Sequence, residues 1–231
     1  MDRGPCHVAI IPDGNRRWAR ARGKRPAEGH IAGAKAASAI LEAALEEEIP
    51  YVTLWGASVA NLTKRSKAER VVLYRVFREY FRRLAVRPEI DRYGVRVRAI
   101  GRWEEFFPPA AADAVRRVVA QTAANTGRHL TFLLGYSGID EMLSAIATLR
   151  AQGSGPPTAD ELKAALWTRD LPPVDLVIRT GGEPHWSQGF LMWDVAEAQL
   201  AFTETLWPAF TPEEFREILE TFRTRERRFG K

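Results

Sequence analysis

Residues 7–19 read His-Val-Ala-Ile-Ile-Pro-Asp-Gly-Asn-Arg-Arg-Trp-Ala, and this stretch decides the fold class. Residues 8–11 form a short apolar run with β-branched side chains, which predicts a buried strand. Residues 12–15 are a cluster of turn formers, so we expect the strand to end abruptly in a loop. The residues that follow predict that this loop turns into a helix.

The remainder of the chain repeats this alternation of strand and helix. Apolar residues recur at helical spacing in four segments, and short apolar runs predict four further strands. This order predicts a mostly parallel sheet covered on both faces. The Gly- and Pro-rich segment 152–157 predicts a surface loop and not a domain boundary. The predicted helices are residues 30–48, 69–84, 110–124 and 138–150, and the predicted strands are residues 51–55, 95–100, 130–134 and 174–178.

Length and composition place the chain among ordinary globular proteins. Of its 231 residues, 45% are hydrophobic and 27% charged, so we expect one α/β domain over residues 1–231. The net charge of +5 favours an anionic partner: nucleic acid, an acidic membrane surface or a phosphorylated small molecule. Cys6 is the only cysteine, which excludes an intrachain disulfide and favours a reducing compartment. No apolar run approaches the ~20 residues of a spanning helix, so we expect a cytoplasmic or membrane-peripheral protein.

Three polar loops follow predicted strands, at residues 12–17, 57–65 and 179–187. Ligands of parallel α/β sheets bind beyond the carboxyl ends of the strands, so these loops form the candidate site. In the first loop Asp13 precedes a glycine and two arginines where a strand turns into a helix, which suits a diphosphate. A single Asp beside phosphate oxygens is also a typical Mg²⁺ ligand. On local sequence alone, a plain Asp/Gly/Asn turn remains the alternative.

The third loop begins with Arg179-Thr-Gly-Gly-Glu, a second glycine-containing loop with an arginine at the end of a strand. This loop suits another phosphate, although a buried Arg–Glu pair with a structural role is the alternative. The sequence has no nucleotide-binding glycine signature, no zinc-ligand spacing and no Gly-x-Ser-x-Gly elbow. The residues by themselves therefore indicate one or two phosphorylated ligands, bound with Mg²⁺.

Taken in order along the chain, the motifs resemble the cis-prenyltransferase family, typified by undecaprenyl diphosphate synthase. The resemblance implies a mostly parallel six-stranded sheet flanked by helices, a hydrophobic tunnel and a homodimer. The implied reaction is cis-prenyl chain elongation: isopentenyl diphosphate condenses with an allylic diphosphate such as farnesyl diphosphate, forming a Z-polyprenyl diphosphate and pyrophosphate. Such a product implies peripheral membrane contact, and nucleic acid is not expected as a partner. The resemblance rests on residues 7–19, Gly29-His30, Ala32-Gly33, Ser58, Asn61, and residues 175–183, 206–208 and 225–230.

The resemblance also implies roles for single residues. Asp13 would hold Mg²⁺ and help the allylic diphosphate leave, and Asn15 and Asn61 would act with it in catalysis. Gln199 stands where the family has a metal-binding glutamate, and as a neutral oxygen donor it should bind Mg²⁺ more weakly. The implied substrate-binding residues are Gly14, Asn15, Arg16, Arg17, Trp18, Arg25, His30, Ser58, Asn61, Leu62, Arg65, Arg179, His185, Ser187 and Arg228, the last reaching across from the partner chain.

Several departures from the family pattern leave alternatives open. His185 replaces an arginine that follows the Gly-Gly-Glu motif, and Gln199 replaces the glutamate named above. The alternatives are a non-catalytic partner subunit that binds prenyl diphosphate and an irregular short-chain coupling of two allylic substrates. The implied tunnel lies between the helix after His30 and the helix that contains Phe77. Gly56 at a strand end favours a medium or long product, although one bulky residue at the tunnel floor would stop the chain early.

Overall fold

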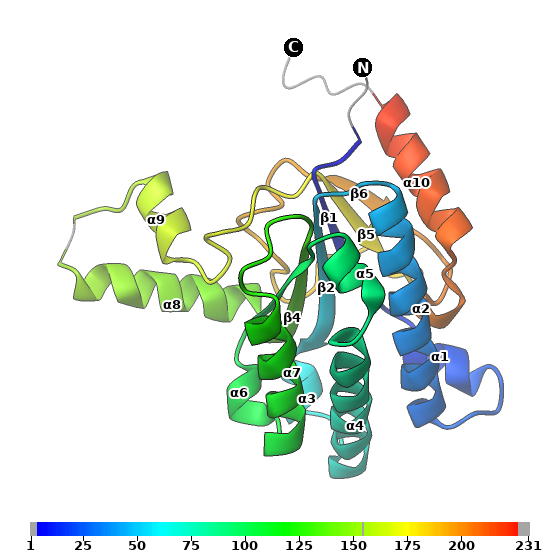
Figure 1. Cartoon of the computed structure of the whole chain (residues 1–231). Coiled ribbons are helices and arrows are strands. Elements are labelled where there is room, and N and C mark those ends of the chain that lie inside the picture. The colour runs from blue at the N-terminus through cyan, green and yellow to red at the C-terminus, as the bar shows by residue number, and fades with distance from the viewer. Residues whose placement is uncertain (1–3, 154, 226–231) are drawn as a thin grey trace.

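A computed structural model describes residues 4–153 and 155–225, which form a six-stranded sheet flanked by helices (Figure 1). The strand order is β3-β4-β2-β1-β5-β6, and each neighbouring pair is parallel. This arrangement confirms the predicted α/β class and the parallel sheet. The strands are β1 (His7–Ile11), β2 (Tyr51–Ser58), β3 (Arg96–Ile100), β4 (His129–Tyr136), β5 (Leu176–Arg179) and β6 (Gln199–Phe202).

Two hydrophobic cores lie on the two faces of the sheet. In β1, Val8 and Ile10 belong to the larger core, whereas Ala9 and Ile11 belong to the smaller one. The strand is therefore buried on both sides, as its unbroken apolar run predicts. The larger core lies against α2, α4, α7 and α10. The helices are α1 (Asn15–Arg20), α2 (Pro26–Glu46), α3 (Val59–Thr63), α4 (Lys67–Leu84), α5 (Pro88–Arg92), α6 (Trp103–Phe106), α7 (Pro109–Gln121), α8 (Gly138–Ala151), α9 (Ala159–Ala165), α10 (Pro212–Thr224) and the 3₁₀ turn η1 (Trp207–Ala209).

Some predicted boundaries are wrong because capping and irregular pairing decide them. Helix α2 begins at Pro26 and not at residue 30, since Arg25 and Glu28 form a capping box and proline suits the first turn. Strand β2 continues past Trp55 to Ser58 through an irregular register with β4. The predicted loop at 57–65 accordingly contains the end of β2 and the short helix α3.

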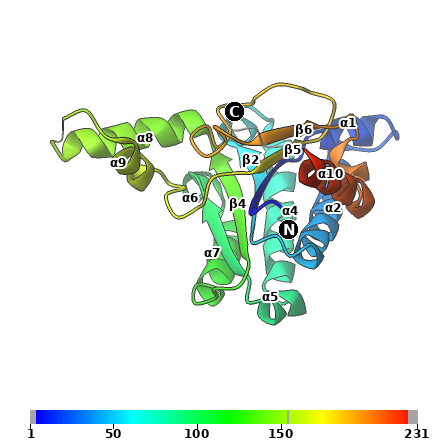
Figure 2. The same cartoon turned by 90° about the horizontal axis from the view of Figure 1, so that it is seen from above.

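The sixth strand was predicted only through the family resemblance. Strand β6 has four residues, which alternate between partly buried and exposed at the edge of the sheet. Such a short edge strand carries little apolar pattern, so periodicity does not reveal it. Helices α8 and α9 extend away from the sheet in both views (Figure 1 and Figure 2). None of the helices within the described ranges is long and apolar enough to cross a membrane.

Candidate active site

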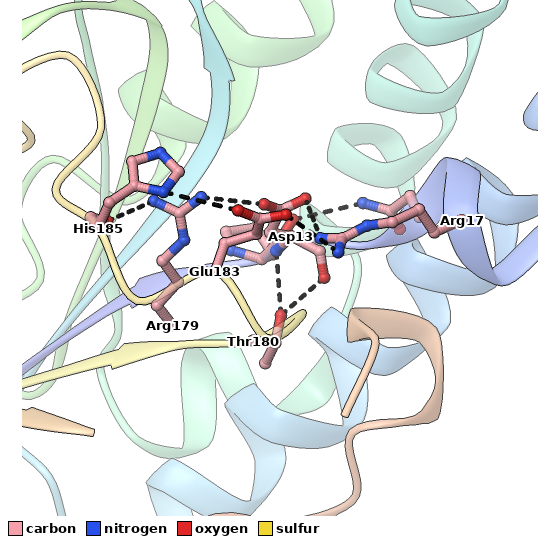
Figure 3. Close-up of polar contacts among 8 residues, drawn as sticks. Asp13, Arg17, Arg179, Thr180, Glu183 and His185 are labelled. Atoms are coloured by element: carbon pink, nitrogen blue, oxygen red, sulfur yellow. Dashed lines mark hydrogen bonds and ion pairs between the residues drawn. The ribbon is translucent and has the colours of Figure 1, made fainter. Parts of the chain in front are cut away.

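The register of β1 with β5 joins the first and third loops. Ile11 pairs with Arg179, so Asp13 and Thr180 emerge side by side although 167 positions separate them. The Asp13 backbone amide donates to Thr180 Oγ1 at 3.0 Å, and the Thr180 hydroxyl donates to the Asp13 carbonyl at 2.9 Å. These two hydrogen bonds fix the backbone from which the Asp13 carboxylate projects (Figure 3).

The Asp13 carboxylate lies between two arginines (Figure 3). Arg179 donates from Nη2 to Asp13 Oδ2 at 3.0 Å, and Arg17 Nη2 lies 3.3 Å from Asp13 Oδ1. Arg17 also reaches Glu183, with 3.4 Å between Nη1 and Oε1. The Arg179 side chain is only 5% exposed, whereas that of Asp13 is 36% exposed. A buried guanidinium therefore anchors a carboxylate that solvent and a ligand can reach.

A second cationic wall comes from α1, α2 and the segment after α3. Arg65 Nη1 lies 3.2 Å from His30 Nε2, and Arg16 lies 3.7 Å from a carboxylate oxygen of Glu69. Burial, and then the charges of Arg65 and Arg16, lower the pKa of His30 to about 4. His30 is therefore neutral near pH 7, and its Nε2 accepts the hydrogen bond from Arg65. An entering diphosphate would meet two guanidiniums and one uncharged imidazole here.

The two walls enclose a pocket of about 390 Å³, within the usual size range of small-molecule sites. An apolar chamber of about 70 Å³ adjoins it and shares part of its lining. The site is thus charged at one end and apolar at the other. Of the predicted site residues, the pocket is lined by Asp13, Gly14, Asn15, Arg16, Arg17, His30, Ser58, Asn61, Arg65, Arg179 and Ser187.

Other predicted residues do not line this pocket. Trp18 packs beneath Arg22, whose guanidinium carbon lies 4.5 Å from the ring centre. Arg25 pairs with Glu28 at the start of α2 and is 85% exposed. Leu62 is fully buried in the larger core. Arg228 lies outside the described residues.

The two residues that depart from the family pattern, His185 and Gln199, also lie outside the pocket. His185 accepts from Arg179 through its backbone carbonyl at 2.6 Å, while its imidazole lies 3.7 Å from Glu183. Gln199 of β6 pairs with Leu176 of β5. Leu176 lies three residues before Arg179 in the same strand, a separation of about 10 Å along the strand. Within one chain, Gln199 is therefore not brought to Asp13. The roles that the resemblance implies for these residues stay predictions.

Asn15 and Asn61 are both held by their own backbone surroundings. Asn15 Nδ2 donates to the Pro12 carbonyl at 3.4 Å, and its Oδ1 is buried without a hydrogen-bond partner in the described part of the chain. Asn61 donates from its backbone amide to Ser58 Oγ and accepts from the Ser58 amide, which makes a capping box for α3. This local pairing positions both residues of the box at the pocket.

Three polar residues in or beside the pocket were not among the predicted site residues. Thr180 braces Asp13, Glu183 pairs with Arg17, and Gln188 lines the pocket beside Ser187. The signal for the first two was present, because both belong to the glycine-containing loop after β5. Gln188 lies beyond that glycine-containing motif, so no sequence pattern indicated it. Only the path of the chain after the motif brings it to the pocket.

Magnesium would depend on the substrate for most of its ligands. Among residues 4–153 and 155–225, no three His, Cys, Asp or Glu side chains gather closely enough to hold a metal by themselves. Mg²⁺ commonly takes one or two carboxylates and completes its shell with waters and substrate phosphates. The accessible carboxylate of Asp13 beside a basic pocket fits an ion that arrives with a diphosphate.

Comparison with known proteins places this geometry in a family. Residues 11–230 match the family model described as putative undecaprenyl diphosphate synthase. The chain is 38% identical to an isoprenyl transferase of Thermus thermophilus, covering 100% of this chain and 91% of the relative. It is 39% identical to a tritrans,polycis-undecaprenyl-diphosphate synthase (geranylgeranyl-diphosphate specific) of Pyrococcus horikoshii. That match covers 98% of this chain and 87% of the relative.

A solved structure agrees with the same assignment. Lavandulyl diphosphate synthase from Lavandula x intermedia, in complex with dimethylallyl diphosphate, superposes with a TM-score of 0.89 at 30% identity over 99% of both chains. The fold and the charged pocket at the strand ends define a transferase of prenyl groups. The chain belongs to the undecaprenyl diphosphate synthase family, the cis-prenyltransferases.

Proposed function

We propose that this pocket carries out cis-prenyl chain elongation, joining isopentenyl diphosphate to an allylic prenyl diphosphate with release of pyrophosphate. The observation that carries the proposal is the carboxylate of Asp13 between Arg17 and Arg179, at a pocket that adjoins an apolar chamber. The charged end suits the diphosphate groups of two substrates. The apolar end suits a prenyl chain, which has no polar group to satisfy.

In this mechanism, arginines stabilise the charge that develops when the allylic C–O bond breaks. Arg16, Arg17 and Arg65 line one part of the pocket and would hold the departing pyrophosphate. Fixed cations are effective here because they need no reorientation as the negative charge grows. Arg179 and Ser187 line another part and would hold the diphosphate of isopentenyl diphosphate. The double bond of that substrate then forms the new C–C bond, and loss of a proton restores a double bond.

Magnesium is the proposed cofactor, with Asp13 as its protein ligand. When bound, the ion would supply positive charge that neutralises the diphosphate groups. Each Asp13 oxygen lies near one arginine and has a second lone pair, which could bind the metal while the arginine contact is kept. Gln199, a neutral donor displaced along β6, is a poor candidate for the same shell in one chain.

We also propose that two copies associate. Ile139, Leu143 and Ile146 are 52%, 60% and 44% exposed and recur along one side of α8, which extends from the body (Figure 2). Leu200 and Phe202 of the edge strand β6 are each 41% exposed. Exposed apolar stripes of this kind are typical of interaction surfaces. Through its apolar product, such an enzyme would also contact a membrane peripherally.

Product analysis tests the proposed reaction. The purified chain is incubated with farnesyl diphosphate, radiolabelled isopentenyl diphosphate and Mg²⁺, and the products are separated by length. We expect incorporation of label and release of pyrophosphate that require both substrates and the metal. Binding of both substrates without incorporation would contradict elongation and favour a non-catalytic partner subunit.

Irregular coupling of two allylic substrates is the second candidate. It is favoured by the structural similarity to a lavandulyl diphosphate synthase that binds dimethylallyl diphosphate. The same preparation is therefore incubated with dimethylallyl diphosphate alone. A condensed product formed without isopentenyl diphosphate would identify irregular coupling, whereas no product is expected under the leading proposal.

A further inference from the structure

The segment at residues 185–195, after β5, forms part of the pocket although it contains only turns. Ser187 and Gln188 line the pocket, and the His185 carbonyl accepts from Arg179 at 2.6 Å (Figure 3). The segment therefore helps to hold Arg179 and supplies Ser187, the two residues that we assign to isopentenyl diphosphate.

The conformation of this segment depends on contacts outside it. Gln188 and Leu191 have φ angles of 47° and 46°, a region that residues other than glycine rarely adopt, so the surroundings must fix them. The Gly138 amide of α8 donates to the Gln188 carbonyl at 3.1 Å. Phe190 and Leu191 are fully buried in the smaller core. These contacts hold the middle of the segment.

Asp194 holds the end of the segment through a buried ion pair. Its side chain is only 2% exposed, and its Oδ1 accepts from Lys163 Nζ of α9. Its backbone carbonyl accepts from the Val174 amide at 2.8 Å. Its Oδ2 is buried without a hydrogen-bond partner in the described part of the chain. Within that part, Lys163 is the one cation paired with this buried carboxylate.

A second buried carboxylate in this region has other partners. Glu141 of α8 accepts from the Tyr136 hydroxyl at 2.5 Å and from the Thr168 amide at 2.8 Å. Burial raises the pKa of Glu141, which favours its neutral form. Lys163 donates instead to the Thr168 carbonyl, at 2.9 Å, and to Asp194. These two hydrogen bonds fix the ammonium group between the turn after α9 and the segment.

We propose that Lys163 is a positioning residue for the isopentenyl diphosphate site, acting through Asp194 on the segment that carries Ser187. The inference rests on the proposed function, because that function assigns this part of the pocket to isopentenyl diphosphate. Lys163 is not among the described residues that line the pocket. A buried charge is costly without a partner, so loss of the ammonium group should drive Asp194 toward water. The segment, and with it the partner of Arg179, would then shift.

Steady-state kinetics of Lys163→Met, Lys163→Arg and Lys24→Met test the proposal. We expect Lys163→Met to raise KM for isopentenyl diphosphate about tenfold, as small misplacements of binding groups do, and to leave KM for farnesyl diphosphate nearly unchanged. Lys163→Arg keeps the charge and should restore most of the loss. Lys24 is the control, because it also pairs with a carboxylate, 3.5 Å from Glu28, but is 46% exposed.

A purely structural role would lower stability without separating the two substrates. An unchanged KM for isopentenyl diphosphate in Lys163→Met, or an equal rise for both substrates, would overturn the proposal. A Lys163→Arg variant as defective as Lys163→Met would do the same. Circular dichroism checks folding, and Lys163→Met/Asp194→Asn, which buries no unpaired charge, replaces Lys163→Met if the single variant does not fold.

Calorimetry separates this claim from the proposed reaction. Isopentenyl diphosphate is titrated, with Mg²⁺, into protein saturated with farnesyl thiolodiphosphate, whose bridging sulfur resists cleavage. We expect about tenfold weaker binding of isopentenyl diphosphate to Lys163→Met than to the wild type, and equal binding of the thiolodiphosphate. Equal affinities for isopentenyl diphosphate contradict the role of Lys163 even if the enzyme elongates chains. The expected difference without any incorporation contradicts only the reaction.

Discussion

Asp13 is the residue on which the chemistry of the site depends. Its carboxylate is 3.0 Å from Arg179 and 3.3 Å from Arg17, and it is the accessible acidic group nearest to both. Replacement by asparagine preserves the shape but removes the charge that a metal and both guanidiniums require. We expect Asp13→Asn to lower turnover by roughly 10²–10³-fold, the usual cost of losing one electrostatic contact to a transition state.

A matched variant is available on the surface for this comparison. Asp113 also pairs with an arginine, at 2.9 Å from Arg116, but it is 70% exposed on α7. Steady-state turnover at saturating Mg²⁺ is measured for Asp13→Asn and Asp113→Asn. Equal turnover in the two variants would exclude the proposed part of Asp13 in catalysis.

His30 should make the protein sensitive to acid. Its pKa of about 4 in the folded chain lies below the value of 6.5 for a free imidazole. As the pH falls from about 6.5 to about 4, the unfolded chain takes up a proton before the folded one, so folding stability is lost over this window. At pH 5 the loss is on the order of 1–2 kcal/mol, allowing for partial solvent screening.

The contribution of His30 to the pH dependence of folding stability is measured by denaturant unfolding at pH 7 and pH 5. His30→Gln cannot take up a proton, so we expect it to lose less stability than the wild type between the two pH values. His7 and His129 also have lowered pKa values, and their contributions cancel in this difference. Identical losses in wild type and variant would show that His30 does not carry the effect.

At the scale of elements, the site depends on a close approach between α1 and α2. A Cβ atom at Gly33 of α2 would lie 2.0 Å from Asn15 Oδ1 and 2.9 Å from Trp207 Cδ1. We expect Gly33→Ala to displace Asn15, to lower the free energy of unfolding by about 1–3 kcal/mol and to reduce turnover. Chemical unfolding and steady-state kinetics check the two effects.

The control for this substitution lies in the loop between α8 and α9. A Cβ atom at Gly155 would meet nothing within 4 Å, so Gly155→Ala should change neither stability nor turnover by much. If Gly33→Ala and Gly155→Ala had comparable unfolding free energies and turnover, the α1–α2 contact would tolerate a methyl group. In that case Asn15 would not be positioned by Gly33.

At the scale of the whole molecule, the apolar side of α8 decides the proposed association. Leu143 is 60% exposed, so its replacement by glutamate should change the stability of a single chain by no more than about 0.5 kcal/mol. A charge buried in an interface is costly, so we expect Leu143→Glu to be monomeric where the wild type is dimeric. Sedimentation velocity measures the two states.

Val86 provides the matched control for the dimer. It is 80% exposed in the turn after α4 and is not part of α8, so Val86→Glu should stay dimeric. A monomeric wild type would contradict the proposed association. If Leu143→Glu remained dimeric, the interface would have to lie elsewhere on the molecule.

The sequence by itself determined the α/β class, the parallel sheet and most of the charged loops. These features are local: the unbroken apolar run of β1 predicts burial on both faces, and the residues after it are turn formers. Asp13 and Arg179 were recognised because each lies in the loop that follows a predicted strand, and parallel strands present their carboxyl ends at one edge. The resemblance to a family supplied the sixth strand and the identity of the ligands.

Only the tertiary structure decided which of these residues meet. The β1–β5 register brings Asp13 to Arg179, the path after β5 turns the His185 side chain to Glu183, and the register of β6 keeps Gln199 away from Asp13. The lowered pKa of His30 likewise depends on neighbours far apart in the chain. Such distances follow from strand register and helix packing, which join residues without regard to their separation in sequence, so local patterns do not contain them.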